Sequence, residues 1–225
     1  MPTETQETVD NRSIVGGGGG DIHVSMKPVM VIGPRPERSE TGVWVGISAI
    51  TMSFAAFTSA MIVRQGASSD WRHFHLPLIL YLNTLILLAS SGTLGLARKH
   101  LAVVAGFLAS APSKAKDGYS EGIGWLYVTA AMGALFVIGQ VLAWRNLAAE
   151  GLFLSTNPSS SFFYVFTALH AMHLLGGIAG LIYIIRKLNR TNGTAQTTGL
   201  NAVCIYWHFM DGLWVYLLIL LAARA

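Results

Sequence analysis

Residues 200–223 read LNAVCIYWHFMDGLWVYLLILLAA, a run of 24 residues with one charged side chain, Asp211. A bilayer core about 30 Å thick is crossed by roughly 20 predominantly apolar residues of α-helix. A membrane-spanning strand would need about half that length and would alternate apolar and polar side chains, which this run does not do. The run therefore predicts a transmembrane helix.

Four similar stretches precede it, and the composition of the whole chain agrees with a membrane protein. Hydrophobic residues make up 52% of the 225 residues and charged residues 12%, whereas a soluble domain carries about 25% charged residues. A water-soluble globular domain is therefore excluded. The sequence predicts an all-α membrane protein, a bundle of five transmembrane helices at about 43–63, 76–97, 123–144, 162–185 and 200–223.

The first 42 residues differ in composition from the rest. Residues 16–20 are five consecutive glycines, and Pro28, Pro34 and Pro36 follow. Such a segment has no apolar core and is typical of a flexible tail. The sequence therefore predicts a flexible tail over 1–42 and a transmembrane domain over 43–225. The single cysteine, Cys204, allows no intrachain disulfide.

Basic residues predict the orientation of the helices. Eleven of the fifteen Lys and Arg residues lie in the tail, the second loop and the fourth loop, and four lie on the opposite side. Loops rich in Lys and Arg stay in the cytoplasm. The amino terminus is thus expected inside and the carboxyl terminus outside. No basic stretch is interleaved with aromatic residues, so no nucleic-acid partner is expected.

Four polar side chains are expected at similar depth on the fourth and fifth predicted helices. Asp211 lies near the middle of the fifth helix and His208 lies one turn before it, while His170 and His173 share a face of the fourth. An ionised aspartate at this depth costs about 2.5–3.5 kcal/mol. Three interpretations stay open: a hydrogen-bond network that joins the two helices, a metal site, and a proton relay.

Other polar and small residues are expected to pack helices together, since close backbone approach and polar contacts drive helix association in lipid. The candidates on the second, third and fourth predicted helices are Asn83, Ser90, Ser91, Gln140, Gly176, Gly177 and Gly180.

Three motifs, in order along the chain, resemble subunit III of the haem–copper oxygen reductases, the cytochrome c and quinol oxidases. Residues 80–94 read LYLNTLILLASSGTL, residues 166–177 read FTALHAMHLLGG, and residues 206–220 read YWHFMDGLWVYLLIL. The third predicted helix and the loop after it, WLYVTAAMGALFVIGQVLAWRNLAAEG at 125–151, also resemble that family. The resemblance covers nearly everything from Val43 to Leu221.

The resemblance implies a five-helix bacterial form of a bundle that has seven helices in longer relatives. It implies a non-catalytic subunit of a respiratory oxidase in the bacterial inner membrane, which reduces dioxygen to water and translocates protons. Haem and copper would lie in partner subunits, with none in this chain and no catalytic, cofactor-binding or metal-binding residue. The chain would pack mainly on subunit I, within a complex that also holds subunit II, and it would bind phospholipid and support assembly, stability and proton uptake.

One departure from the family and three alternatives remain. Many relatives carry a glutamate in the first of these five helices, but residues 43–63 contain no acidic residue. A role that depends on that carboxylate is therefore in doubt here. The chain could instead accompany a nitric oxide reductase, or be a stand-alone membrane metalloenzyme built on the histidines. A small transporter lacks support, because internal repeats and broken helices are absent from the sequence. The electron donor and any respiratory supercomplex are not identified by the sequence.

Overall fold

The structure is a computed structural model that describes residues 38–67, 77–107, 112–151, 153, 157–191 and 199–224. The glycine run and the rest of the predicted tail up to residue 37 lie outside these ranges, so flexibility of the tail stays a prediction. Residues 38–42, also assigned to the tail, form the start of the first helix.

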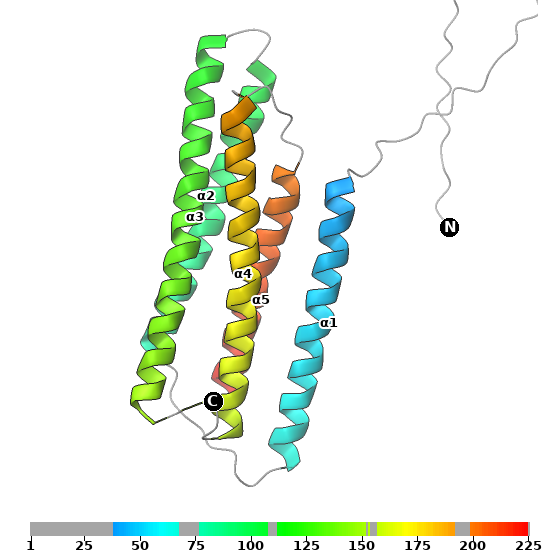
Figure 1. The fold of residues 1–225 in the computed structure, drawn as a ribbon, viewed down its shortest axis with the longest axis vertical. Helices are drawn as coiled ribbons and strands as arrows, with labels where there is room; N and C mark the ends of the chain where they lie inside the picture. The colour runs from blue at the N-terminus through cyan, green and yellow to red at the C-terminus, as the bar shows by residue number, and fades with distance from the viewer. Residues whose placement is uncertain are drawn as a thin grey trace, which may run out of the picture. The chain divides into compact units, whose positions relative to one another are not determined.

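Five long helices make up the described chain. They are α1 (Arg38–Ala67), α2 (Leu78–Phe107), α3 (Pro112–Ala149), α4 (Pro158–Thr191) and α5 (Leu200–Arg224). Each is long and apolar enough to cross a membrane. Successive helices run in opposite directions, so that α1 begins at the end of the bundle opposite to that where α5 ends (Figure 1). The prediction of five long apolar helices is confirmed for the described residues, and their arrangement is consistent with a five-span membrane bundle.

The helices extend beyond the apolar stretches that predicted them. The largest difference is in α3, which begins at Pro112, eleven residues before the predicted Ile123. The added turns contain Lys114, Lys116 and Asp117. Hydropathy reports only the part of a helix that suits lipid, whereas polar residues continue the same helix into water. Proline is favoured at the first position of a helix, since its missing N–H is not needed there, and both α3 and α4 begin with proline.

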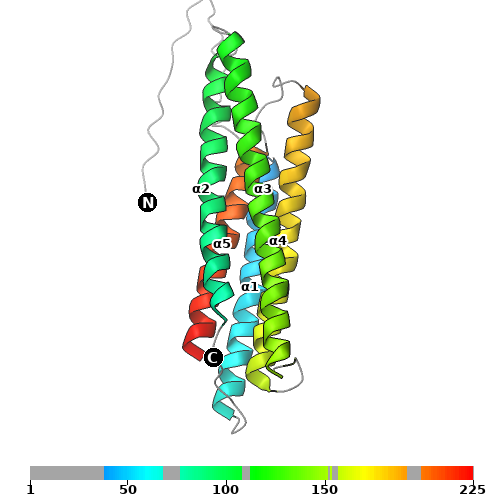
Figure 2. The same cartoon turned by 90° about the vertical axis from the view of Figure 1, so that its left-hand side faces the viewer.

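The helices are arranged so that α1 stands at one edge. Helix α2 packs along α3, α3 packs on α4, and α5 contacts both α2 and α4. Among the described residues, α1 contacts α4 and α5 and neither α2 nor α3. Figure 1 shows this order, with α4 and α5 lying between α1 and the α2–α3 pair, and Figure 2, seen from the α2–α3 side, has α1 behind them.

Large aromatic side chains fill the centre of the bundle, and glycines make room for them. Trp207 and Trp214 of α5 and Phe136 of α3 are almost completely buried. Phe136 meets Trp214 edge to face, with ring centroids 4.8 Å apart. The Trp207 ring lies over Gly133 of α3, where an added Cβ would stand 2.9 Å from the ring. Removing apolar surface from lipid gains nothing, so this close packing is what holds the helices together.

Candidate functional site

Asp211 lies inside the bundle with an unpaired carboxyl group. Its side chain is 5% exposed, and neither carboxyl oxygen has a hydrogen-bond partner in the described chain. Ser91 of α2 lies close to the carboxyl group without meeting hydrogen-bond geometry. Buried polar groups are nearly always paired. Asp211 is therefore a residue whose partner is not among the described parts of this chain.

His208 lies on the surface of α5, one turn before Asp211. Its Nδ1 atom is 2.5 Å from the Oγ atom of Ser91, so the pair joins α5 to α2. The His208 side chain is otherwise exposed. The sequence predicts a partner for this histidine on the fourth helix, whereas the hydrogen bond that the structure shows goes to the second.

His170 is completely buried between aromatic rings. Its ring centroid is 4.9 Å from that of Trp214 and 5.7 Å from that of Phe136. Neither ring nitrogen has a hydrogen-bond partner in the described chain. His170 therefore links α4 to α5 by ring packing, not by a hydrogen bond.

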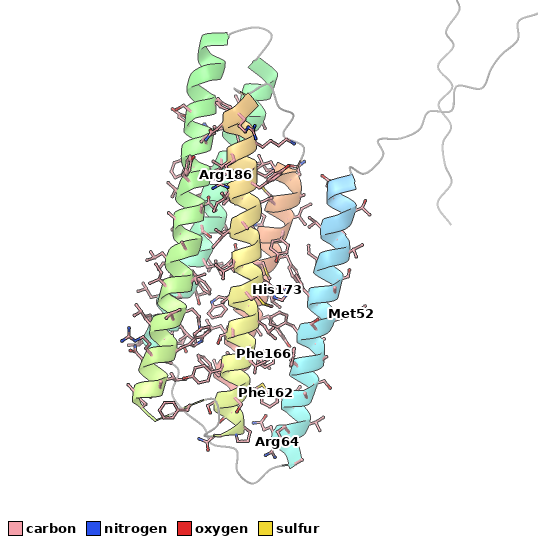
Figure 3. All side chains as sticks on the ribbon, viewed as in Figure 1. Met52, Arg64, Phe162, Phe166, His173 and Arg186 are labelled. Carbon is pink, nitrogen blue, oxygen red and sulfur yellow. The ribbon has the colours of Figure 1, made fainter. Side chains whose placement is uncertain are left out.

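His173 is half-buried on the side of α4 that faces α1, as Figure 3 shows. Its Nδ1 atom lies 2.7 Å from the Leu169 carbonyl oxygen one turn earlier in the same helix. Its ring is 6.0 Å from that of Phe54 on α1. Phe54 also stacks on Phe166 of α4 at 6.3 Å. These aromatic contacts are what join α1 to α4 at this level.

The four predicted polar residues are not hydrogen-bonded into one cluster. Because His170 and Asp211 have no side-chain hydrogen bond in the described chain, neither is bonded to another member of the set. Helices α4 and α5 are instead joined by the Tyr206 hydroxyl group, which donates a hydrogen bond to the His173 carbonyl oxygen at 2.9 Å. In the described residues, no three His, Cys, Asp or Glu side chains are placed to hold a metal ion. A role of the set in joining the two helices stays a prediction.

The residues expected to pack helices occupy varied positions. Asn83, Ser90 and Gln140 are buried, and the Asn83 amide lies against Gly139 so closely that a Cβ there would overlap it. Both amide atoms of Gln140 and the Asn83 nitrogen lack partners in the described chain. Gly177 approaches the Tyr206 ring, at 3.1 Å from an added Cβ, while Gly180 and Gly176 have looser contacts, near Val203 and the Tyr206 hydroxyl group.

Sequence analysis missed the hydrogen bonds that the buried tryptophans make. Trp207 Nε1 donates to Ser90 Oγ at 3.1 Å, and Trp214 Nε1 donates to Thr84 Oγ1 at 2.9 Å. Both bonds join α5 to α2 at the depth of the predicted polar set. The sequence held a clue to these bonds. Trp207 and Trp214 are seven residues apart and so share a face of the helix, and a buried indole N–H needs a hydrogen-bond acceptor.

Comparison with known proteins gives a consistent result. The family model described as cytochrome c oxidase subunit III matches residues 50–223. The chain is similar to a probable cytochrome c oxidase subunit 3 of Mycobacterium tuberculosis, with 32% identity over 189 residues, 81% of this chain and 86% of the relative. It is similar to cytochrome c oxidase subunit 3 of Thermostichus vulcanus, with 30% identity over 83% of this chain and 88% of the relative. It is also similar to cytochrome bo(3) ubiquinol oxidase subunit 3 of Pseudomonas aeruginosa, with 30% identity over 77% of this chain and 79% of the relative.

Proposed function

The chain belongs to the cytochrome c oxidase subunit III family, and from this premise we propose that it is the non-catalytic third subunit of a respiratory haem–copper terminal oxidase. In this role it packs on subunit I, in a complex that also contains subunit II. Its part is to support the assembly, stability and proton uptake of a complex that reduces dioxygen and translocates protons.

The observation that carries this proposal is the extent of the match. The matched residues, 50–223, begin within α1 and end one residue before the end of α5, so they cover the whole of α2, α3 and α4, nearly all of α5 and the second part of α1. Short motifs arise by chance, whereas a match over every helix of a bundle does not. The match thus supports a subunit that keeps the family's complete five-helix unit.

The arrangement of the polar residues supports a non-catalytic role. His170 is enclosed by aromatic rings, His173 turns back onto its own helix, and His208 pairs with a serine. None of these arrangements aims several ligands at one point in the described chain. In this proposal the haem and copper of the oxidase lie in the partner subunits. The apolar outer faces of the bundle are expected to bind phospholipid.

The proposed location is the inner membrane of a bacterium, with the amino terminus in the cytoplasm. The distribution of Lys and Arg among the loops supports this orientation. The names of the relatives give two different electron donors: one relative is called a cytochrome c oxidase subunit and another a ubiquinol oxidase subunit. Donor binding belongs to other subunits, so the donor is left unassigned.

Purification through a tag on this chain in a mild detergent tests the proposal. The sample is expected to contain haem-bearing and copper-bearing partners, to give a haem optical spectrum, and to consume dioxygen. The chain separated from its partners is expected to hold no stoichiometric metal, and His173→Ala to change nothing in that metal analysis. A purified chain that brings no haem-bearing partner, or that alone holds a metal lost on His173→Ala, would contradict the proposal.

A further inference from the structure

The outer surface between α2 and α5 carries a polar group in the middle of the membrane. His208 is the ninth residue of the span Leu200–Ala223, and Ser91 is near the middle of the span Leu78–Val103. The His208 Nδ1 atom is paired with Ser91. The other ring nitrogen, Nε2, has no hydrogen bond in the described chain, and the His208 side chain is exposed.

Lipid tails offer no hydrogen bond to such a group. Polar side chains within a membrane accordingly face protein or a water-filled cavity almost without exception. Exposed serines on α1 do not raise the same problem: Ser48 and Ser53 donate to the carbonyl oxygens of Trp44 and Ala49 in their own helix. His208 differs because its Nε2 atom has no such hydrogen bond within the described chain.

The backbone around this histidine is open to close approach. Gly212 lies one turn after His208, and Gly92 follows Ser91. Both glycines are exposed, and an added Cβ at either would meet nothing within 4 Å. Small residues at a membrane helix surface allow the backbone of another helix to come near. Helices α2 and α5 form the left-hand side of the bundle in Figure 2, where no further described helix covers them.

The unpaired carboxyl group lies directly behind this surface. Asp211 is buried, lacks a hydrogen-bond partner in the described chain, and lies close to the same Ser91 hydroxyl group. Ser91 thus stands between an exposed histidine and a buried acid. The described chain leaves His208 Nε2 and the Asp211 carboxyl group without hydrogen bonds. This indicates that a hydrogen-bonding group of another molecule lies near them.

We propose that the surface formed by Ser91, Gly92, His208 and Gly212, here called the α2–α5 face, packs against a transmembrane helix of the haem-bearing subunit, and that this helix presents a hydrogen-bonding side chain to His208 Nε2 at mid-membrane. The inference rests on the proposed function, because it locates the contact that a non-catalytic oxidase subunit must make. The two glycines let the helix approach, and the histidine fixes its register.

Photo-crosslinking in the assembled complex tests the location. The single natural thiol, Cys204, is buried, so Cys204→Ala provides a background for Ile219→Cys labelled with a benzophenone maleimide. Ile219 is exposed and lies two turns after Gly212 on the same side of α5, so the label stands beside the glycine contact and does not fill it. A matched probe is placed by Ile138→Cys on α3, another exposed isoleucine. Illumination is expected to join Ile219→Cys to the haem-bearing subunit, identified by mass and haem content, with at least a fivefold higher yield than Ile138→Cys.

Bulky substitution tests whether the contact matters. Gly212→Leu and His208→Leu are expected to lower the haem that co-purifies with the tagged chain at least fivefold, while Gly124→Leu, at an exposed glycine of α3 with nothing within 4 Å of an added Cβ, leaves it unchanged. Thermal unfolding of the chain with Gly212→Leu is expected to match that of the unsubstituted chain, because Gly212 is exposed. The chain with His208→Leu is expected to unfold at a slightly lower temperature, because it also loses the hydrogen bond to Ser91. Ser91→Ala, which removes the support of His208, is expected to give a smaller loss than His208→Leu.

Three results would overturn the inference: crosslinks from Ile219→Cys to lipid alone, crosslinks to a second copy of this chain, or normal haem recovery with Gly212→Leu. Each leaves the proposed function intact if the unsubstituted chain still brings a haem-bearing partner. Absence of any such partner from the unsubstituted chain refutes the proposed function instead.

Discussion

The indole nitrogen of Trp207 on α5 donates a hydrogen bond to the hydroxyl oxygen of Ser90 on α2, and both side chains are completely buried. The same Ser90 hydroxyl group donates to the Leu87 carbonyl oxygen at 2.6 Å. A serine thus serves as acceptor for one helix and as donor within its own. This pairing fixes the rotation of α5 relative to α2, because a turn of either helix would leave a buried N–H unpaired.

Trp207→Phe is expected to destabilise the chain more than Ser90→Ala. The serine substitution removes one hydrogen bond between helices, which averages about 0.6 kcal/mol in membranes, together with the local bond from Ser90 to the Leu87 carbonyl oxygen inside α2. The tryptophan substitution removes the same bond and also leaves space against Gly133 and Gly177, for a cost of about 1–3 kcal/mol. Thermal unfolding of the detergent-solubilised chain measures both. Equal losses would show that the hydrogen bond, and not the packing of the ring, dominates.

Gly133→Ala is expected to lower stability by about 1–3 kcal/mol, as overpacking of a filled core does. An added methyl group would stand 2.9 Å from the Trp207 ring and 3.3 Å from Ile178. The ring is rigid and completely buried, so the helices must separate. Gly124→Ala on the same helix is the control, because its added methyl group meets nothing within 4 Å. Unfolding temperatures compare the two variants, and a similar change in both would contradict the close packing of Trp207 on Gly133.

His170→Phe is expected to leave the thermal stability of the chain unchanged or to raise it by about 1 kcal/mol. Phenylalanine keeps the ring contacts with Trp214 and Phe136 and removes two buried nitrogens that lack partners in the described chain. Unpaired buried polar groups cost about 1–3 kcal/mol. His170→Ala, which removes the ring, is expected to lower stability by several times that gain. A marked loss with His170→Phe would instead favour the hydrogen-bond network predicted from the sequence.

Asp211→Ala is expected to reduce the yield of assembled oxidase more than the turnover of each assembled complex. The carboxyl group has no hydrogen bond in the described chain, and under the proposed non-catalytic role the chain affects the reaction through assembly. Haem recovered through a tag on this chain measures yield, and dioxygen consumed per haem measures turnover. Asp211→Asn, which retains the shape and the hydrogen-bonding ability, is the matched control and is expected to assemble better than Asp211→Ala. Normal yield with reduced turnover would contradict this view and favour a proton relay.

The number and type of helices could be predicted because lipid demands long apolar helices. Their ends could not be predicted in the same way. The first turns of α3 contain Lys114 and Asp117, which hydropathy assigns to a loop, yet they continue the helix that begins at Pro112. The membrane determines only the length of the apolar part of a helix. Where the helix begins and ends beyond that part depends on local helix propensity and on capping residues.

The predicted site was harder to derive than the fold. The spacing of His170 and His173 places them on adjacent turns, but they serve different neighbours: one packs on Trp214 of α5 and the other on Phe54 of α1. Periodicity gives the face on which a residue lies, whereas its partner depends on how neighbouring helices are rotated and displaced. For that reason the sequence could place His208 at mid-membrane and could not identify Ser91 as its partner.

The edge position of α1 has a consequence for the order of synthesis. The partners of α1 are α4 and α5, and among the described residues it contacts neither α2 nor α3. After α1 ends at Ala67, it must therefore wait for the 124 residues up to Thr191, the end of α4, before the first of these partners is complete. At about 5–20 residues per second, this interval is roughly 6 to 25 seconds. During that time neither α4 nor α5 is available to hold α1, so its place in the membrane depends on the apolar length of the helix itself.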